Sequence, residues 1–378
     1  MIFQSELAEI RQREFPIVAD WRYFDTATYG PHPARYVQRM TELAQSLSRQ
    51  PLGDASAGID RVRTAAAQVL HAPEQNVALL RSTGEGLNLL AGGLDWQLGD
   101  EVLLYELDFP SLIAPWLALG ERGVVVQVVP DRGRNRFDAD DFRRLVTPRT
   151  RAIAVSLVNN TTGFRAPVED LAGLCRERDI WFGVDAVQAV GSTVVNAHSL
   201  GADVVAAHGY KFLLSGFGYA IAYVSERAIE RLRVPHVGMS NMQAGDARTL
   251  FDKGLQLLES ARRFEPSVPN LPAVLAMGES LDLLCEAGLE QIDAHIRLLC
   301  SRLTEGLHEH GYTLVTSAQP GESAGIVCVR KPHADQQSVY KALLAKHVVS
   351  AVRGGNLRFA PHLFNTADEV DEVLALLP

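Results

Sequence analysis

Lys211 lies between two apolar runs, in the segment DVVAAHGYKFLLSGFGYAIAYV at residues 203–224. A lysine ammonium group normally stays in water, because burying an unpaired charge is costly. One explanation is that Lys211 ends a strand and points outward. The other is chemical, because partial desolvation lowers the pKa of a lysine amine and leaves a neutral nucleophile. The chemical explanation requires partner groups at neighbouring strand ends.

Six polar residues end or follow apolar runs of this kind. In an open α/β sheet, ligands bind beyond the carboxyl ends of the strands, so polar residues at several such ends can act together. For the acid among them, capping the next helix is the alternative role. The six residues are Asn159, Asn160, Asp185, Gln188, His208 and Tyr210.

A further candidate site precedes a helical pattern in LLRSTGEGLNLLAGGL at residues 79–94. Ser82, Thr83, Gly84 and Gly86 are small or hydroxyl residues at the start of this apolar run. The first N–H groups of a helix have no partner within it and carry positive partial charge, so such a start can bind an anion. An ordinary N-cap is the alternative.

Pyridoxal 5'-phosphate needs all three kinds of group. Its phosphate needs N–H and hydroxyl donors, its aldehyde needs an amine, and its ring nitrogen needs a carboxylate that keeps it protonated. Lysine is the side chain that forms the imine. We therefore expect this cofactor, with Lys211 as its Schiff-base lysine and Asp185 at its ring nitrogen.

The elements that must position these groups alternate between strand and helix. Short, nearly continuous apolar runs are typical of strands that are covered on both faces. Amphipathic stretches at 137–147 and 167–179 separate some of them, which indicates an α/β fold with a mostly parallel sheet. The last two runs are joined by a short connection and could pair antiparallel. The runs lie at 101–105, 123–129, 152–158, 180–185, 203–207 and 219–224.

The pattern changes after about residue 250. A long helical pattern at 289–311 leads into short predicted strands, and Thr366 and Glu369 have the spacing of a capping box. We predict an N-terminal segment at 1–20, a large cofactor-binding domain at 21–255, and a smaller α+β domain at 256–378.

Composition excludes several functional classes. The 378 residues carry a net charge of −9, so no basic field attracts nucleic acid or an anionic membrane. The four cysteines form no CxxC pair, and GFG after Lys211 lacks the GxGxxG spacing of a nicotinamide-binding turn. The charged N-terminus lacks the apolar core of a signal peptide, and no apolar run is long enough for a membrane span. We expect a cytoplasmic protein without metal ligands.

The sequence resembles the class V aminotransferase family of fold type I pyridoxal-phosphate enzymes, which includes cysteine desulfurases, kynureninases and isopenicillin N epimerases. The resemblance spans nearly the whole chain. It implies a seven-stranded, mostly parallel sheet between helices, with a smaller C-terminal domain. The similar motifs are WRYFDTATYGPHP, RSTGEGLN, LDFPSLIAPW, VNNTTG, VDAVQAVG, AHGYKF, RRFEPSVPN and LRFAPHLFNTADEVDEVL.

The resemblance implies a phosphate site made by Thr83, Gly84, His208 and Tyr210. The RRFEPSVPN motif resembles a segment that reaches the phosphate of the other subunit in this family, so a homodimer with a shared active site is expected. Val268 stands where the family often has a threonine, and the cross-subunit contact thereby loses its hydroxyl.

The resemblance also assigns residues to the cofactor ring and to the substrate. Phe109 stacks on the ring, Gln188 reaches its oxygen, and Asn160 lies near both the ring hydroxyl and the substrate. Arg358 binds the substrate carboxylate, for which a guanidinium fork is well suited. Tyr29 is a further substrate-binding candidate.

The resemblance favours an enzyme that acts at Cα of an amino acid through the Lys211 Schiff base. Aminotransferase is the main expectation, and a β-lyase of the C–S type or an epimerase is the alternative; a non-catalytic relative with this fold is another. A cysteine desulfurase is not expected, because HVVSAVRGGNLRFAP contains no cysteine and Cys328 lies upstream in an apolar run. Candidates for the choice of reaction are Tyr29, His32, His236 and Arg353.

Overall fold

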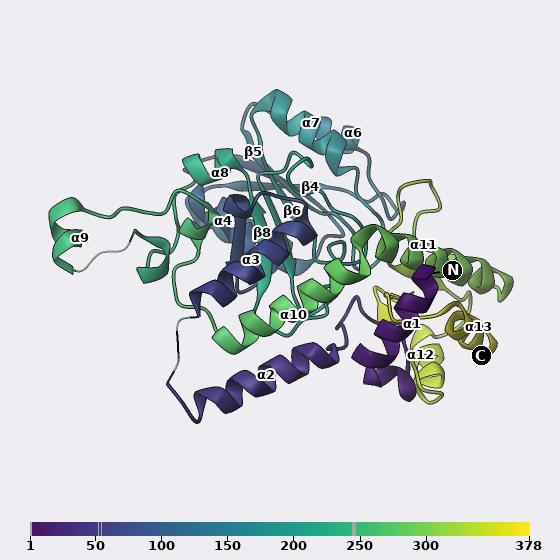
Figure 1. Cartoon of the computed structure of the whole chain (residues 1–378). Helices are drawn as coiled ribbons and strands as arrows, with labels where there is room; N and C mark the ends of the chain where they lie inside the picture. Colours follow the sequence, from purple (N-terminus) through teal and green to yellow (C-terminus); the bar gives the residue numbers. More distant parts are fainter. Residues whose placement is uncertain (1, 52, 54, 244–246) are drawn as a thin grey trace.

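The computed structural model describes residues 2–51, 53, 55–243 and 247–378. Its centre is a seven-stranded sheet in the order β2-β8-β7-β6-β5-β3-β4 (Figure 1). Neighbouring strands from β7 to β4 are parallel, and β8 pairs antiparallel with both β7 and β2. The predicted α/β fold class is confirmed. The strands are β2 (Val77–Leu80), β3 (Glu101–Tyr105), β4 (Val125–Val129), β5 (Thr150–Ser156), β6 (Trp181–Asp185), β7 (Val204–His208) and β8 (Ala220–Val224).

Helices cover both faces of this sheet, and successive strand residues alternate between two apolar cores. In β5, for example, Ile153 and Val155 belong to one core while Ala152 and Ala154 belong to the other. This is why the strands read as continuous apolar runs. The first core contains side chains of α3 (Ser56–Leu70), α7 (Val168–Arg178) and α10 (Leu271–Ala287). The second contains side chains of α4 (Thr83–Gly93), α5 (Pro110–Leu117) and α8 (Glu226–Arg231).

The C-terminal part forms a second, smaller α+β unit. Its four-stranded antiparallel sheet has the order β12-β13-β10-β9 and packs its apolar face against three helices in a third core. The predicted domain boundary at 255/256 stays a prediction; α10, which follows it, packs against α2 (Ala34–Leu47) and α3. The elements are β9 (Thr313–Leu314), β10 (Val327–Arg330), β12 (Ala351–Arg353), β13 (Asn356–Phe359), α11 (Leu289–Glu309), α12 (Gln336–Leu344) and α13 (Ala367–Ala375).

The N-terminal segment packs on the C-terminal part (Figure 1). Strand β1 (Arg22–Tyr23) pairs in parallel with β11 (Val348–Val349), and a further parallel bridge joins Asp25 to Ala360. In α1 (Ile2–Glu14), the Arg11 guanidinium donates to Glu369 of α13 at 2.6 Å. The predicted capping box at the start of α13 is present. The remaining helices are α6 (Ala139–Arg143) and α9 (Ala247–Lys253).

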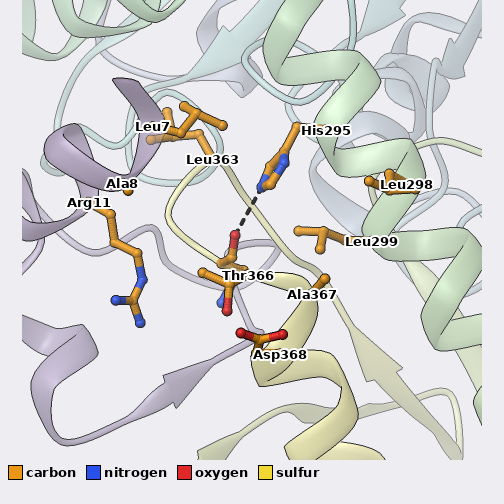
Figure 2. A pocket seen from close by; sticks show the side chains of 11 residues that line it. Leu7, Ala8, Arg11, His295, Leu298, Leu299, Leu363, Thr366, Ala367 and Asp368 are labelled. Carbon is orange, nitrogen blue, oxygen red and sulfur yellow. Dashed lines mark hydrogen bonds between the residues drawn. The ribbon is translucent and has the colours of Figure 1, made fainter. Parts of the chain in front are cut away.

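A pocket of about 270 Å³ lies where α1, α11 and α13 meet (Figure 2). Its apolar wall includes Leu7, Leu299 and Leu363, and His295 contacts the backbone carbonyl of Asn365 at 2.9 Å. None of the predicted site residues lines it. Among the described residues, no helix combines the length and the apolar character that crossing a membrane requires.

Candidate active site

Lys211 lies in the turn between β7 and β8, and its side chain is buried rather than pointing outward. The residue is 7% exposed. Its Nζ lies 5.7 Å from the ring centroid of Phe109 and 5.7 Å from that of Tyr210. The turn is held by hydrogen bonds from the Leu214 amide to the Lys211 carbonyl and from the Ser215 amide to the Gly209 carbonyl. The chain therefore fixes an amine near two aromatic rings at the carboxyl end of the sheet.

Burial lowers the pKa of Lys211 to about 8, and the charges of Arg358 and Arg353 act in the same direction. Asp185 and Asp25 oppose this shift because they favour the ammonium form. A lysine with this pKa is partly neutral near pH 7, and a neutral amine can attack a carbonyl.

Gly30 allows the segment before α2 to pack closely against the backbone of this lysine. Its amide donates to the Tyr210 carbonyl at 2.8 Å, and a Cβ added at Gly30 would lie 2.2 Å from the Lys211 backbone oxygen. A side chain cannot be accommodated at that distance without moving the backbone. The glycine in the sequence motif YGPHP thus permits a close approach between residue 30 and the lysine turn.

Asp185 is the last residue of β6, near the middle of the sheet. It is buried, and one carboxylate oxygen accepts a hydrogen bond of 2.9 Å from the Val187 amide. Burial raises the pKa of Asp185, whereas this hydrogen bond and the Lys211 charge oppose the increase. A buried carboxyl group with one backbone donor and a nearby amine can accept a further hydrogen bond from a ligand N–H.

Three buried polar atoms of the predicted site have no partner among the described residues. They are Thr83 Oγ1, Gln188 Oε1 and His208 Nδ1. Buried polar atoms normally have a hydrogen-bond partner, so unsatisfied ones at strand and helix ends are consistent with a polar ligand. Burial lowers the pKa of His208 to about 4, so this imidazole is neutral near pH 7. The Thr83 hydroxyl and the His208 imidazole can donate to the phosphate of pyridoxal 5'-phosphate, and the Gln188 amide oxygen can accept a hydrogen bond from the ring hydroxyl, so the three atoms fit this cofactor.

The expected phosphate end of the site is the start of α4. Ser82 is the N-cap, and its hydroxyl accepts a hydrogen bond of 3.0 Å from the Glu85 amide. Thr83 and Gly84 begin the helix and can offer amide donors. A Cβ at Gly84 would contact only the Ser82 hydroxyl, at 3.7 Å, so space does not require glycine there. It is Gly86 that does, because a Cβ would lie 2.6 Å from Ala206 of β7.

Gln188 follows Asp185 and links the sheet to the N-terminal segment. Its Nε2 donates to the carbonyl of Ala27 at 3.1 Å, while its Oε1 stays unpaired. The side chain is 2% exposed. Sequence analysis placed Gln188 at this strand end, and the structure brings Ala27 there as well.

Aromatic side chains form one wall around the lysine. The ring of Tyr210 stacks on Phe217 at 4.9 Å and lies 4.2 Å from His208, while Tyr29 contacts both Tyr210 and Phe217. Phe109, Phe217 and Tyr29 remain exposed despite their size. Phe217 was not predicted as a site residue; its place in GFG after the lysine was the available signal.

The two asparagines that follow β5 have different roles. The Asn159 side chain accepts hydrogen bonds from the amides and hydroxyls of Thr161 and Thr162 and donates to the Leu107 carbonyl, so it organises the loop. Asn160 is half-buried, and its carbonyl accepts a hydrogen bond of 2.8 Å from Arg358. The predicted residue Asn160 therefore contacts the predicted carboxylate-binding arginine through its backbone.

Arg358 lies in β13 and is 1% exposed. Besides Asn160, its guanidinium contacts Asp25 Oδ1 at 3.1 Å and Thr28 Oγ1 at 2.5 Å. Arg353 donates to the same Thr28 hydroxyl at 3.1 Å. Sequence analysis did not assign Asp25 or Thr28 to the site. Their place in the motif WRYFDTATYGPHP was the only signal.

Asp108 is a second buried acid near Asp185. Its Oδ1 accepts a hydrogen bond of 3.1 Å from the amide of Ser156, and its Oδ2 has no partner among the described residues. Ser156 is in turn the registered neighbour of Asp185 across β5 and β6. Burial raises the pKa of Asp108 to about 7, and the charge of Asp185 adds to the shift. Sequence analysis did not assign this residue to the site.

Three other candidates lie apart from the lysine or at the surface. Val268 is 61% exposed and lines a pocket of about 430 Å³ beside Arg81. His236 is exposed, and His32 packs its ring against Tyr36 at 4.7 Å. None of the contacts among described residues joins these three to Lys211.

A family model described as aminotransferase class-V matches residues 22–368. A probable cysteine desulfurase from Methanothermobacter thermautotrophicus is 26% identical, over 98% of this chain and 96% of the relative. An uncharacterized aminotransferase from Schizosaccharomyces pombe is 28% identical, over 79% of this chain and 72% of that relative.

Two solved structures with low identity show that the fold is shared. A cysteine desulfurase from Thermococcus onnurineus has a TM-score of 0.86 and 22% identity, with 97% of this chain and 96% of that chain covered. A cystine C–S lyase, solved with its product cysteine persulfide, has a TM-score of 0.87 and 21% identity, with 96% and 98% covered.

Proposed function

The chain belongs to the class V aminotransferase family, whose cofactor is pyridoxal 5'-phosphate, and on that premise we propose that it is a β-lyase that breaks the Cβ–S bond of a cysteine-like amino acid. The observation that carries its amino-acid chemistry is the buried amine of Lys211, which shares one site with Asp185 and Arg358. An amine, an acid and a guanidinium are the groups that this chemistry requires.

The relatives favour carbon–sulfur chemistry over the transamination that was the main expectation from sequence. Members of the family catalyse several reactions, so membership alone does not distinguish a lyase from an aminotransferase. Probable cysteine desulfurases from Methanothermobacter and Pyrococcus both align with nearly the whole of this chain. Because their substrate and that of a C–S lyase share a Cβ–S bond, we infer a sulfur-containing amino acid as substrate.

The cysteines of this chain support direct release of sulfur rather than its transfer to the protein. The thiols of Cys175 and Cys328 are buried, and burial raises the pKa of Cys328 to about 12. Burial also raises the pKa of Cys285 to about 11 and that of Cys300 to about 12. The sequence has no cysteine after Cys328. Since the thiolate is the reactive form, none of these groups is poised to accept sulfur.

We assign the cofactor-binding residues from the unpaired atoms and the fold. Thr83, the Gly84 amide, His208 and Tyr210 would hold the phosphate, and Val268 would approach it from a second copy of the chain. Phe109 would cover the ring, with Gln188 and Asn160 near its oxygen. When bound, the cofactor supplies an aldehyde for the amine and a ring that accepts electrons from Cα.

The protein's own groups would then handle protons and charge. Lys211 would hold the cofactor and, once the substrate amine displaces it, take the proton from Cα through its neutral Nζ. Asp185 would keep a proton on the ring nitrogen. As the Cβ–S bond breaks, its electron pair leaves with sulfur, and a new double bond forms between Cα and Cβ. Arg358 would hold the substrate carboxylate, with Tyr29 at the site entrance.

A homodimer with a shared active site is part of the proposal. Large apolar side chains stay exposed near the site, including Tyr29 at 51% and Phe217 at 63%. Exposed apolar groups gathered around a polar site are typical of a surface that another molecule covers. A second copy that covers these side chains would also bring its Val268 loop to the first copy's phosphate.

The test is to supply L-cysteine and L-cystine to the cofactor-loaded protein and to identify the carbon product. β-Elimination releases pyruvate and ammonia together with sulfur, because the enamine product tautomerises to an imine and water hydrolyses that imine. Attack of a protein thiol on sulfur leaves alanine instead. Pyruvate is expected without any added keto acid. Alanine as the product would overturn the proposal in favour of desulfurisation.

Two controls make this test specific. Lys211→Ala should release no pyruvate, and Cys328→Ala should keep most of the parent activity because its thiol is buried. Transamination is recognised separately, since it requires a keto-acid acceptor and yields a new amino acid from it. Turnover only in the presence of such an acceptor would restore the aminotransferase hypothesis.

A further inference from the structure

The pocket of Figure 2 is separate from the site around Lys211, and the proposed function does not use it. Two helix faces and a turn form its walls. Leu7 and Arg11 lie one helical turn apart on α1, and His295 and Leu299 lie one helical turn apart on α11. The turn that leads into α13, together with the first residues of that helix, completes the walls. Three parts of the chain that are distant in sequence therefore meet around one space.

Leucine side chains give this pocket its apolar wall. Leu7 and Leu363 belong to the first core and Leu299 to the third, so two cores meet at the pocket without filling it. Leu298 also lines it and is 55% exposed. Packed side chains rarely leave spaces larger than a water molecule between them, whereas this space of about 270 Å³ has the volume of about nine waters. The wall is suited to a small ligand with an aliphatic part.

Two of the lining side chains carry a charge, and the two charges have opposite signs. They are Arg11 and Asp368. Figure 2 shows the guanidinium and the carboxylate on the side of the pocket away from Leu7 and His295. The imidazole of His295 is neutral near pH 7, because burial lowers its pKa more than the hydrogen bond to the Asn365 carbonyl raises it. A ligand that matches this wall carries one negative and one positive group next to an aliphatic part.

Arg11 has donors left for such a ligand. Its Nε donates to the Phe364 carbonyl at 2.8 Å, and its Nη2 donates to Glu369 at 2.6 Å. A guanidinium has five N–H donors, so three remain, and none of the described residues accepts a hydrogen bond from Nη1. Two contacts thus hold the guanidinium in place while its other edge can donate to a carboxylate.

Asp368 is the one carboxylate of α13 without an ion pair in the described part of the chain. The helix carries three other carboxylates, and each of them pairs with an arginine. Asp368 is exposed, so its oxygens can accept hydrogen bonds from an ammonium group. The three pairs are Glu369 with Arg11, Asp371 with Arg302, and Glu372 with Arg22.

We propose that this pocket is a binding site for an aliphatic α-amino acid such as leucine, with its carboxylate on Arg11, its ammonium group on Asp368 and its side chain against the leucines. A carboxylic acid without an amine would leave Asp368 without a partner, and an amine without a carboxylate would leave Arg11 Nη1 without one. A polar side chain would lose its hydrogen bonds to water at the leucine wall. The amino acid is bound there and not converted, since none of the lining residues belongs to the site around Lys211.

The experiment measures binding by calorimetry, on cofactor-loaded protein in which borohydride has reduced the bond between Lys211 and the cofactor. The reduction prevents an added amine from displacing Lys211. L-Leucine should bind with a dissociation constant of about 10 µM to 1 mM, as expected for a ligand of its size. Isocaproate lacks the amine and isopentylamine lacks the carboxylate, so each should bind at least about tenfold more weakly. L-Asparagine, which has the shape of leucine but a polar end, should also bind at least about tenfold more weakly.

Variants of the two charged residues locate the binding. Asp368→Asn should raise the dissociation constant of leucine about tenfold and leave that of isocaproate unchanged. Asp371→Asn, on the same helix but outside the pocket, is the matched control and should bind leucine like the parent. Arg11→Gln should weaken the binding of leucine and isocaproate but not of isopentylamine. Because it also loses the contact with Glu369, its thermal unfolding is recorded, and Asp368→Asn decides if it does not fold.

Three results would overturn the proposal. One is the absence of binding heat with leucine up to about 10 mM. The others are equal binding of leucine and asparagine, and an Asp368→Asn variant that binds leucine like the parent. None of these measurements depends on release of pyruvate, so this proposal goes beyond the proposed function and the two can fail independently.

Discussion

Asp25 and Arg358 are 333 positions apart in the chain, yet Asp25 Oδ1 accepts a hydrogen bond of 3.1 Å from Arg358 Nη2. Both side chains are buried. Burial raises the pKa of Asp25 and lowers the pKa of Arg358, and the attraction between them opposes both shifts. Such a pair adds little net stability, but removing one partner leaves a buried charge without compensation.

Asp25→Asn should therefore destabilise the protein strongly. We expect the free energy of unfolding to fall by about 3 kcal/mol, the typical effect of leaving one partner of a buried pair alone. The midpoint and slope of the urea unfolding transition give this free energy. Asp371→Asn removes a carboxylate from the exposed pair with Arg302 and should leave the free energy of unfolding close to that of the parent. Similar losses of stability in both variants would show that the buried Asp25–Arg358 pair contributes no more than the exposed pair.

The pKa of Lys211 predicts how cofactor capture depends on pH. Because burial lowers this pKa to about 8, the neutral amine becomes about tenfold scarcer for each pH unit below it. Cofactor-free protein should regain the visible absorption of the bound cofactor faster as the pH rises, with a plateau above about 8. Arg353→Gln should move the plateau upward, since that guanidinium disfavours the ammonium form. A plateau above pH 10 in the parent would contradict the assignment.

Asp108 should make stability depend on pH in an unusual direction. Its folded-state pKa of about 7 is above the unfolded value, so the folded protein binds more protons between about pH 4 and 7. Stability from this group is lost as the pH rises through that range, by up to about 4 kcal/mol. The difference in free energy of unfolding between Asp108→Asn and the parent should therefore shift in favour of the variant by that amount as the pH rises from about 4 to about 7. A constant difference between the two proteins would show that the carboxyl does not titrate there.

Gly30→Ala tests the close approach over the lysine turn. The added Cβ would lie 2.2 Å from the Lys211 carbonyl oxygen, so the turn must move. Such overpacking typically costs about 1–3 kcal/mol, and the displaced lysine should bind cofactor more weakly. Absorption titration and thermal unfolding give the two readouts. Gly120→Ala, where an added Cβ has open space, should behave like the parent in both.

Local pattern was enough to predict most of the sheet. The apolar runs at 101–105 and 180–185 are β3 and β6 almost to the residue, because both faces of each strand are buried and most of their positions are apolar. The helical pattern at 289–311 is α11, and the capping box at Thr366 begins α13 as predicted. Strand β2 was missed, since VALL is too short to stand out from the helices beside it.

The site itself was predictable only where each group follows its own strand. Asp185 and Lys211 can be recognised in the sequence because each is a charged residue next to an apolar run. The partners of Arg358 do not, because Asp25 and Thr28 meet it through pairing of distant segments that leaves no local pattern. Asp108 was hidden for a related reason: it precedes a proline-started helix and reads as an ordinary turn residue.

The parallel pairing of β1 with β11 also sets a temporal order. A ribosome makes the chain from residue 1 onward, so β6 with Asp185 and the turn with Lys211 emerge well before β11 and before β12, which carries Arg353. Until then Asp25 lacks its guanidinium partner and β1 lacks its neighbour. The end of the site assigned to the cofactor can therefore take shape during synthesis, whereas the end assigned to the substrate is assembled only when the last part of the chain is made.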